Sequence, residues 1–450
     1  MTSENLHLLT ANKAISLIKE KEISVLDLVN ALIDRTEKIN PETRAWVHLN
    51  YNQSRECALK FDKLIKSKQS IDPLNGIPIG IKDIFNTSDF PTEMGSPLWK
   101  NFTPGNDARV IYNIKMANGI IFGKTETAEF AVHTLGNSQN PYDSKRSPGT
   151  SSSGSAIAVA THMVPLALGT QTAGSIIRPA SFCGVYGFKP SFGLIPRTGM
   201  LKTTDSLDQI GFFAKSPEDL QILFDVIRVK GRDYPLSNTI LNNIQRQNII
   251  NRKWKIKFVK TSTWKNTEDY VKRNIEKFIN KLKEFEEFDI EELSLPQKFD
   301  SAHKMHELIY TKSLSYYFKE ELKNETLVSK IFYEFAQKAK NISIPEYDFA
   351  IKYQSNISRD LDEEFCHFDI IISLSTAGYA PFRGEKEMDD PSLIWTMCGV
   401  PTINIPAFHH NDLPFGVQII SRRYNDILLL QFLNILYEKK IISDAPSPKI

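Results

Sequence analysis

Serine, glycine and threonine crowd one stretch of the chain, from Ser147 to Gly199, which also keeps apolar runs that flexible linkers lack. Within it, 24 residues separate Ser151 from Ser175, enough chain for a helix and a strand to bring both hydroxyls to one pocket. A serine hydroxyl becomes an effective nucleophile only when a base takes its proton. Such a stretch alone is more often a surface loop, so a catalytic role depends on a base elsewhere in the sequence.

Lys82 is the candidate base. It directly follows the apolar, strand-like segment 76–81, and Ile79 and Ile81 indicate that this segment is buried. Burial disfavours the ammonium form, and lowering the pKa of a lysine from about 10.4 to near 7 corresponds to roughly 4–5 kcal/mol of differential solvation. A neutral Lys82 can accept a proton. The alternative is a solvated strand end that pairs with Asp83, to which we otherwise assign a supporting role at the site.

Helical and strand patterns alternate along the chain, which predicts an α/β fold. A capping-box-like start at Ser24 predicts an amphipathic helix that stops before Pro41, and Ser216 followed by Pro217 predicts another helix start. Continuous apolar residues predict buried strands at 76–82, 120–122 and 370–372.

The segment 235–365 is richer in Lys, Asn and Glu than its surroundings, yet no Ser/Gly linker bounds it. We therefore expect one domain over residues 1–450, with a core at about 74–230 and a divergent, substrate-facing elaboration at about 235–390. A second lobe is the alternative.

Four segments, in order, resemble the blocks of the amidase signature family. They are GIPIGIKD around Lys82, PGTSSSGSA around Ser151, GTQTAGSIIRPASFCGVYGFKPSFGLIPRTG around Ser175, and SLDQIGFFAKSPEDL. The likeness extends to INPETRAWV, LIWTMCGVPTINIPAF and PFGVQIISRRYND, so it covers nearly the whole chain and is weakest at 235–365. It implies a mixed central β-sheet wrapped by helices on both faces. It also implies hydrolysis of an amide C–N bond without metal or cofactor.

The resemblance assigns a catalytic triad residue by residue. Ser175 matches the nucleophile, Ser151 the bridging serine, and Lys82 the base. It also implies a cis peptide bond between Thr150 and Ser151. The assignment is chemically coherent, because Ser151 can pass the Ser175 proton to Lys82 and later return it to the leaving amine.

The turn Thr172-Ala173-Gly174-Ser175 is the predicted oxyanion hole, because it offers consecutive backbone N–H groups beside the nucleophile. The family commonly has Asp-x-Gly-Gly-Ser here, whereas this chain has Gln171 in place of the aspartate and Ala173 in place of the first glycine. Ala173 keeps its N–H, so the hole remains possible with this variant.

Two residues are candidates for substrate binding. Arg178 lies three residues after Ser175, where many family members carry the arginine one position earlier. Its guanidinium either binds a substrate carboxylate or pairs with an internal carboxylate as a structural group. Tyr379, in the loop 376–379, is expected to border the pocket.

Composition and charge exclude several classes of protein. The 450 residues are 41% hydrophobic and 24% charged, as in ordinary globular proteins. The 55 basic and 53 acidic residues leave a net charge of +2, too small for a nucleic-acid or anionic-membrane footprint. The N-terminal sequence lacks a signal-peptide pattern and no run of about 18 apolar residues occurs, so we expect neither export nor a membrane span.

The cysteine and histidine patterns give no metal site. Cys57, Cys183, Cys366 and Cys398 form no C-x-x-C pair, which favours the reducing cytoplasm. The segment 303–307, with two histidines, matches neither H-E-x-x-H nor H-x-x-E-H, so we expect a solvated helix face there.

The sequence thus predicts a cytoplasmic enzyme, an amidohydrolase that releases ammonia or an amine from a small-molecule amide and needs no cofactor. One alternative is the glutaminase subunit of a tRNA-dependent amidotransferase, although LIWTMCGVPTINIPAF looks more like free-standing amidases. Another is a catalytically silent protein that kept the fold for binding. The acyl group and the oligomeric state cannot be read from the sequence, and a homodimer is compatible with it.

Overall fold

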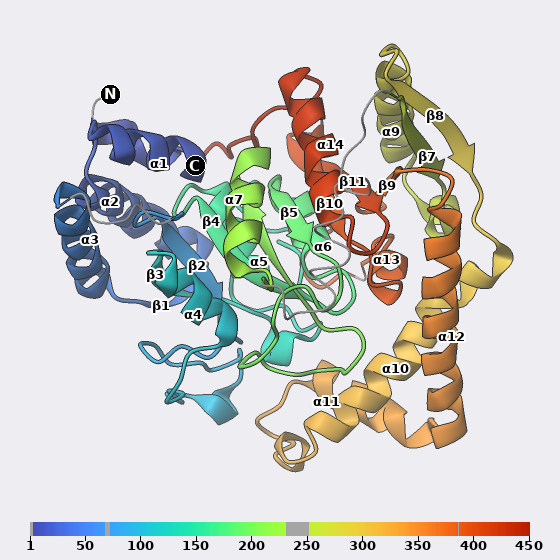
Figure 1. Ribbon diagram of the computed structural model, residues 1–450. Coiled ribbons are helices and arrows are strands. Elements are labelled where there is room, and N and C mark those ends of the chain that lie inside the picture. Colours follow the sequence, from blue (N-terminus) through green and yellow to red (C-terminus); the bar gives the residue numbers. More distant parts are fainter. Residues whose placement is uncertain (1–2, 68–72, 231–251, 386) are drawn as a thin grey trace.

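One mixed β-sheet organises the chain. The computed structural model describes residues 3–67, 73–230, 252–385 and 387–450. Within them, 11 strands form a single sheet in the order β1-β3-β2-β4-β6-β5-β10-β11-β9-β7-β8 (Figure 1). The strands are β1 (Trp46–Leu49), β2 (Pro78–Lys82), β3 (Ile120–Thr125), β4 (Leu166–Gln171), β5 (Tyr186–Lys189), β6 (Gln209–Ala214), β7 (Trp254–Val259), β8 (Phe288–Leu293), β9 (Ile370–Leu374), β10 (Thr402–His410) and β11 (Leu413–Ser421).

The strands in the middle of the sheet are buried along their whole length, because helices cover both faces. β2, β3, β4 and β6 contain no exposed residue, as expected for continuous apolar strands. The edge strand β8 instead alternates at its start, with Phe288 and Ile290 buried and Asp289 between them exposed. The buried strands expected at 76–82, 120–122 and 370–372 are confirmed as β2, β3 and β9.

Two groups of helices lie on opposite faces of the sheet (Figure 1). α4, α7 and α14 pack together on one face, whereas α5 and α6 pack together on the other. The α-helices are α1 (Ala11–Glu20), α2 (Val25–Thr43), α3 (Tyr51–Lys66), α4 (Arg109–Met116), α5 (Ser153–Ala160), α6 (Ile177–Cys183), α7 (Pro217–Ile227), α9 (Asp269–Leu282), α10 (Ala302–Tyr317), α11 (Lys330–Lys338), α12 (Ile344–Glu364), α13 (Leu393–Met397) and α14 (Asp426–Glu438). The predicted α/β fold, with helices on both faces of a mixed sheet, is confirmed.

Helix starts follow the sequence signals more closely than helix ends. Ser24 forms the predicted capping box with Asp27, and Ser216 accepts the Asp219 N–H ahead of α7. The predicted stop before Pro41 is wrong, because α2 continues to Thr43 with the proline inside its last turn. At that position the proline removes a single helical N–H, so the end of the helix tolerates it.

α10, α11 and α12 form a helical layer that extends from one end of the sheet, and α10 also contacts the short helix α13 (Figure 1). These elements lie outside the core that the sequence predicts at about 74–230, and they bring distant side chains to the site described below. No helix of the described residues has the length and apolarity needed to cross a membrane.

Candidate active site

Lys82 is the last residue of β2, and parallel pairing with β4 places it near the end of that neighbouring strand. Its side chain is completely buried. Lys82 Nζ donates hydrogen bonds to Ser151 Oγ and Thr170 Oγ1, each at 2.8 Å. The structure therefore joins two of the predicted triad residues directly and adds a hydroxyl, Thr170, that was not predicted.

The surroundings of Lys82 favour the neutral amine. Burial lowers the pKa of Lys82 well below its ordinary value, and the carboxylates of Asp208 and Glu126 offset only part of this effect. Among the described residues, no acidic side chain lies within ion-pair distance of Lys82 Nζ. Asp83 pairs with Lys124 at 2.9 Å instead of Lys82, so the support that we expected from this carboxylate goes to another lysine.

Ser151 lies just ahead of α5, where the start of the helix is bound to β4. Ser152 Oγ donates to Thr170 O at 3.1 Å, and Thr170 N donates to Ser152 Oγ at 3.2 Å. The Ser151 carbonyl accepts the Ala128 N–H at 3.3 Å. The peptide bond between Thr150 and Ser151 is cis, as the resemblance implied. These contacts fix Ser151 between its own helix and the Lys82 amine.

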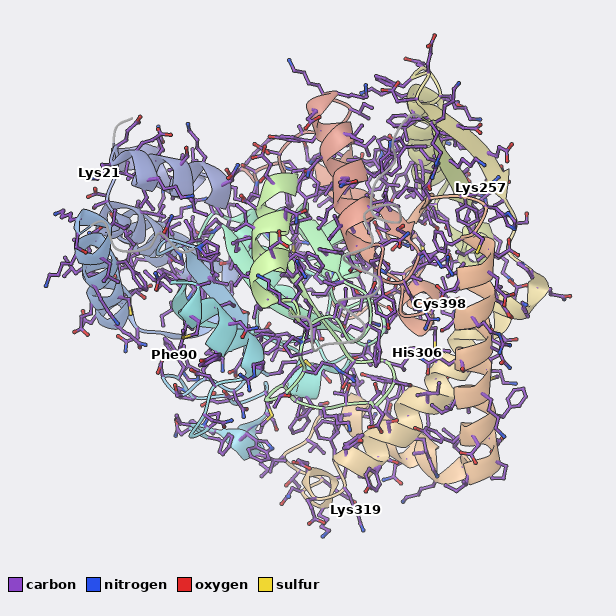
Figure 2. All side chains as sticks on the ribbon, viewed as in Figure 1. Lys21, Phe90, Lys257, His306, Lys319 and Cys398 are labelled. Atoms are coloured by element: carbon purple, nitrogen blue, oxygen red, sulfur yellow. The ribbon has the colours of Figure 1, made fainter. Side chains whose placement is uncertain are left out.

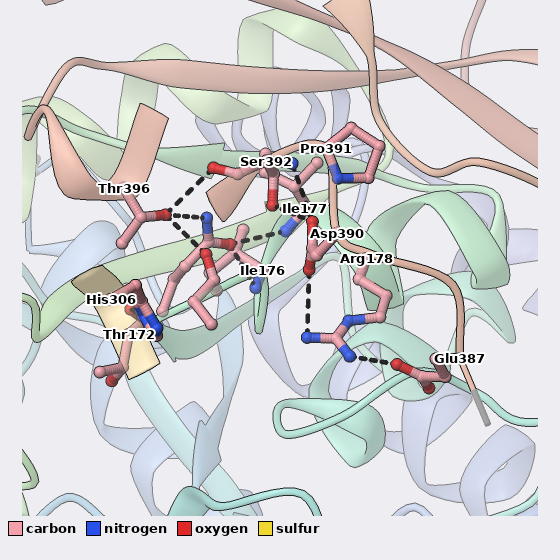
Figure 3. A network of polar contacts seen from close by, with 12 residues as sticks. Thr172, Ile176, Ile177, Arg178, His306, Glu387, Asp390, Pro391, Ser392 and Thr396 are labelled. Atoms are coloured by element: carbon pink, nitrogen blue, oxygen red, sulfur yellow. Dashed lines mark hydrogen bonds and ion pairs between the residues drawn. The ribbon is translucent and has the colours of Figure 1, made fainter. Parts of the chain in front are cut away.

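Ser175 lies in the turn between β4 and α6, and the Gln171 side chain closes this turn. Gln171 Oε1 accepts the N–H groups of Ile176 and Ile177 at 2.8 and 3.0 Å (Figure 3). Gln171 Nε2 donates to Thr396 Oγ1 of α13 at 2.9 Å. An ionised aspartate, the common residue at this position, has no donor for the second contact.

Three consecutive carbonyls of the turn each accept a hydrogen bond. His306 Nε2 donates to Thr172 O at 2.8 Å, and Thr396 Oγ1 donates to Ala173 O at 2.6 Å. The Gly174 carbonyl accepts the Arg178 N–H at 2.9 Å. Among the described residues, the N–H groups of Ala173, Gly174 and Ser175 have no acceptor. The turn thus presents free donors beside the candidate nucleophile.

The solvated face expected at 303–307 holds Lys304 and Glu307, which are exposed, and His303 is partly buried, but for His306 the expectation is wrong. His306 is 4% exposed and points into the molecule, whereas Lys319 projects from the end of the same helical layer (Figure 2). His303 Nε2 contacts Asp390 O at 3.0 Å. Both rings bind backbone carbonyls, and no group of three His, Cys, Asp or Glu side chains suited to a metal ion occurs in the described residues.

Arg178 and Tyr379, the candidate substrate-binding residues, line one cavity of about 150 Å³. The Arg178 guanidinium donates to Glu387 and lies 3.1 Å from Asp390 Oδ2 (Figure 3). Burial alone would lower the pKa of Arg178, but these carboxylates raise it above its ordinary value. This pairing is the arrangement expected of a structural arginine. Tyr379 stacks on Tyr270, with ring centroids 5.3 Å apart.

Sequence reasoning missed the side chains that hold the turn, His306 and Thr396. They are separated from their partners by 134 and 223 residues. Thr396 lies inside LIWTMCGVPTINIPAF, a segment whose resemblance to the family gives no role to the threonine. Nothing in the periodicity of α10 distinguishes a histidine that binds a carbonyl from one that faces solvent.

The fold and the contact of Lys82 with Ser151 agree with one class of hydrolase. A sequence model of the family described as Amidase matches residues 27–430. The chain therefore belongs to the amidase family.

The proteins that this chain is similar to have different names. A glutamyl-tRNA(Gln) amidotransferase subunit from Sulfurihydrogenibium sp. (strain YO3AOP1) is 31% identical, over 95% of this chain and 96% of the relative. A structure described as an unexpected vestigial protein complex that reveals the evolutionary origins of an s-triazine catabolic enzyme has a TM-score of 0.88 and 22% identity, over 97% of this chain and 100% of that chain. The native peptide amidase of Stenotrophomonas maltophilia has a TM-score of 0.83 and 22% identity, over 97% of this chain and 98% of that chain. At such identities the two structures establish the fold alone.

Proposed function

We propose that the chain is a free-standing amidohydrolase that cleaves the C–N bond of a small-molecule amide through an acyl-enzyme on Ser175. The observation that carries this proposal is the contact between the fully buried Lys82 Nζ and Ser151 Oγ, at 2.8 Å. A neutral amine bonded to a serine hydroxyl is what a proton relay from a second serine requires.

The reaction begins when Ser175 Oγ attacks the substrate carbonyl while its proton passes through Ser151 to Lys82. The carbonyl oxygen becomes negatively charged, and the free N–H groups of Ala173, Gly174 and Ser175 stabilise it. Collapse of this intermediate breaks the C–N bond, and the proton on Lys82 returns through Ser151 to the leaving nitrogen.

Water then completes the cycle. It attacks the acyl-enzyme and gives one proton to the relay. As the second tetrahedral intermediate collapses to the carboxylic acid, the relay returns this proton to Ser175 Oγ and Lys82 is neutral again. The net reaction is amide plus water to carboxylic acid plus ammonia or amine. Each step uses only side chains and backbone groups of this chain, so the proposal needs no cofactor.

The names of the sequence relatives favour a second candidate, the glutaminase subunit of a tRNA-dependent amidotransferase. The relative from Sulfurihydrogenibium is named as part of a glutamyl-tRNA(Gln) amidotransferase and aligns with 95% of this chain. In that case the same relay would release ammonia from glutamine for a partner protein. We place it second because LIWTMCGVPTINIPAF resembles free-standing amidases more than that subunit.

Ammonia release by the purified chain tests the proposal. The panel contains glutamine, dicarboxylic monoamides, ureides and neutral amides, with the Ser175→Ala variant as the blank. We expect turnover of at least one amide without any partner or tRNA. Activity on glutamine that appears only with added amidotransferase subunits would support the second candidate. A chain that hydrolyses no amide and whose Ser175 fails to react with a fluorophosphonate would be a binding protein.

We also propose that the protein works in a reducing compartment such as the cytoplasm. All four cysteines, Cys57, Cys183, Cys366 and Cys398, are unpaired. Stable extracellular proteins more often carry disulfides.

A further inference from the structure

We propose that His306 and Thr396 are positioning residues that orient the Ala173 and Gly174 N–H groups toward the oxyanion formed at Ser175. The inference rests on the proposed function and assigns a task to two side chains that lie far from the nucleophile in the sequence. It also accounts for the burial of polar side chains of α10 and α13 against the turn 172–175, which we call the nucleophile turn.

The geometry of the peptide bond couples each carbonyl of the turn to the N–H of the next residue. In a trans peptide the C=O of one residue and the N–H of the next point in opposite directions. His306 Nε2 binds the Thr172 carbonyl at 2.8 Å, and this carbonyl shares its peptide plane with the Ala173 N–H. Thr396 Oγ1 binds the Ala173 carbonyl at 2.6 Å, and this one shares its plane with the Gly174 N–H. Each contact therefore directs one free N–H away from the helix that holds the carbonyl.

The protonation state of each anchor follows from its partner. A carbonyl oxygen can only accept, so His306 must carry its proton on Nε2. Burial lowers the pKa of His306 to about 4, which keeps the ring neutral at physiological pH. The Thr396 hydroxyl donates its proton to Ala173 O, and its oxygen accepts from Gln171 Nε2. Neither anchor brings a charge close to the developing oxyanion.

Gln171 connects the two ends of the turn. Its Oε1 binds the N–H groups of Ile176 and Ile177, and its Nε2 binds Thr396. The residues before and after Ser175 are thereby tied to one hydroxyl on α13. An ionised aspartate has no N–H to donate, so the link to Thr396 depends on the amide of Gln171.

The anchors are themselves held in place. His303, one turn before His306 on α10, contacts the carbonyl of Asp390 at 3.0 Å. Asp390 in turn lies against the nucleophile turn, where a Cβ on Gly174 would meet its Oδ2 at 1.6 Å. α10 and the segment leading into α13 therefore brace one another and the turn. Both anchors are nearly inaccessible, with His306 4% and Thr396 0% exposed.

Two pairs of variants test the proposal. Thr396→Val removes the hydroxyl at nearly constant shape, and Thr396→Ser retains it. His306→Phe removes the ring donor, and His306→Gln offers an amide N–H in its place. Thr311→Val is the matched control, because this threonine is also buried on α10 and its hydroxyl has no partner among the described residues.

The primary measurement is the rate at which a fluorophosphonate labels Ser175. This reaction requires no identified substrate, and its product is a tetrahedral centre that resembles the oxyanion intermediate. Deleting an oxyanion donor costs about 10²–10³ in rate, so misdirecting one should slow labelling by about 10- to 100-fold in Thr396→Val and His306→Phe. We expect Thr396→Ser and His306→Gln to recover most of the rate. For any amide that the wild type hydrolyses, kcat should fall while KM changes little.

The outcomes separate this inference from the proposed function. If the folded wild type is labelled and Thr396→Val and His306→Phe are labelled as fast as Thr311→Val, the positioning role is wrong and the amidohydrolase remains. If the melting temperature and the labelling rate fall together in all four variants, with no recovery in the Ser and Gln forms, the two residues are merely structural and the inference is again overturned. A folded wild type whose Ser175 is never labelled and that hydrolyses no amide of the panel overturns both proposals.

Discussion

Lys82 is the residue on which the proposed chemistry of the site depends, and its protonation state also bears on stability. A lysine ammonium in this position would have two hydroxyl partners, Ser151 and Thr170, but no paired carboxylate. The nearby carboxylate of Asp208 accepts bonds from Thr172, Thr203 and Thr204 instead. Because a buried charge without a counter-ion is costly, the neutral amine is the stable form. The same form is the one that can take a proton.

Removing the triad should abolish turnover without unfolding the protein. Ser175→Ala deletes the proposed nucleophile, and Lys82→Ala deletes the proposed base, so each should lower kcat by about 10⁴-fold or more while the double variant loses little further. Steady-state ammonia release and circular dichroism check this together. A Lys82→Ala variant that keeps most of its activity at pH 7–9 would contradict the relay.

The stability of the protein should reveal the depressed pKa of Lys82. The unfolded chain binds a proton at this lysine up to about pH 10.4, while the folded chain does not. The unfolded state therefore binds more protons, and the free energy of unfolding contributed by Lys82 rises with pH, by at most about 1.4 kcal/mol per pH unit. It falls as the pH drops from about 10 toward the folded-state pKa.

Urea unfolding of the wild type and Lys82→Met between pH 6 and 10 measures this contribution. The methionine variant cannot titrate at this position. The unfolding free energy of the wild type should therefore increase relative to that of the variant as the pH rises. Parallel curves would mean that Lys82 has an ordinary pKa in the folded protein.

Arg178 should behave as a structural residue rather than as a receptor for a substrate acid. Its guanidinium is buried and paired with Glu387 and Asp390. Removing one partner of such a group leaves uncompensated buried charge and costs about 3–5 kcal/mol. Arg178→Gln should therefore lower the melting temperature and reduce activity equally on charged and neutral amides.

A second substitution provides the control for Arg178. The pair Arg178→Gln and Glu387→Gln removes one charge of each sign and should recover part of the lost stability. A selective rise of KM for carboxylate-bearing amides, in a protein of unchanged melting temperature, would restore the alternative that Arg178 binds substrate.

At the scale of elements, sequence patterns predicted those structures whose signals are local. The apolar runs gave β2, β3 and β9, and the caps at Ser24 and Ser216 located two helix starts. The predicted end of α2 was wrong, because a proline in the last helical turn costs the helix only one hydrogen bond. The central strands are buried on both faces, so they appear in the sequence as continuous apolar runs that can be predicted.

The candidate site was predictable only where short motifs carry it. Lys82 and Ser151 meet as expected, because parallel pairing and the start of α5 fix both positions. His306 and Thr396 were not predicted, since their contacts join segments more than a hundred residues apart and depend on how α10 and α13 pack. Such contacts have no local periodicity.

Contact between α1 and α7 should depend on pH through one buried carboxylate. Asp219 of α7 accepts the N–H groups of Ala11 and Asn12, at the start of α1, at 2.9 and 2.8 Å. Burial raises the pKa of Asp219 to about 7, against the opposing effect of these hydrogen bonds. The folded state therefore binds an extra proton between about pH 4 and 7, and its contribution to stability falls as the pH rises through that window.

The Asp219→Asn variant measures this effect. Relative to the variant, the wild type should lose up to about 4 kcal/mol of unfolding free energy from pH 4 to pH 7, the equivalent of raising the pKa from 3.8 to about 7. Urea unfolding over this range, with Asn12→Ala as a control that keeps the backbone N–H, gives the comparison. An unchanged difference across the range would show that Asp219 titrates normally.

At the scale of the whole molecule, one sheet connects the signature core with the divergent region. β9 pairs with β11 on one side and with β7 on the other, so strands of the divergent region continue the same hydrogen-bonded sheet. α14 covers this junction, and its Phe432 packs against Trp254 of β7 with ring centroids 5.1 Å apart. Buried residues of β4, β6, β7 and β9 belong to one hydrophobic cluster, whereas a second cluster joins α10, α12 and α13.

This continuity predicts that the chain unfolds as one unit rather than as a core and a second lobe. Breaking the β9–β7 pairing alone would expose Trp254 and the buried residues of β7. Because the chain would gain little conformational entropy in return, partial opening is unfavourable. Hydrogen exchange followed by mass spectrometry in increasing urea tests this. Peptides from β4 and β6 should lose protection at the same urea concentration as peptides from β7 and β9. If β7–β8 and the helices α9–α12 lose protection well before β4 and β6, the divergent region is a separate folding unit and the single-domain prediction is wrong.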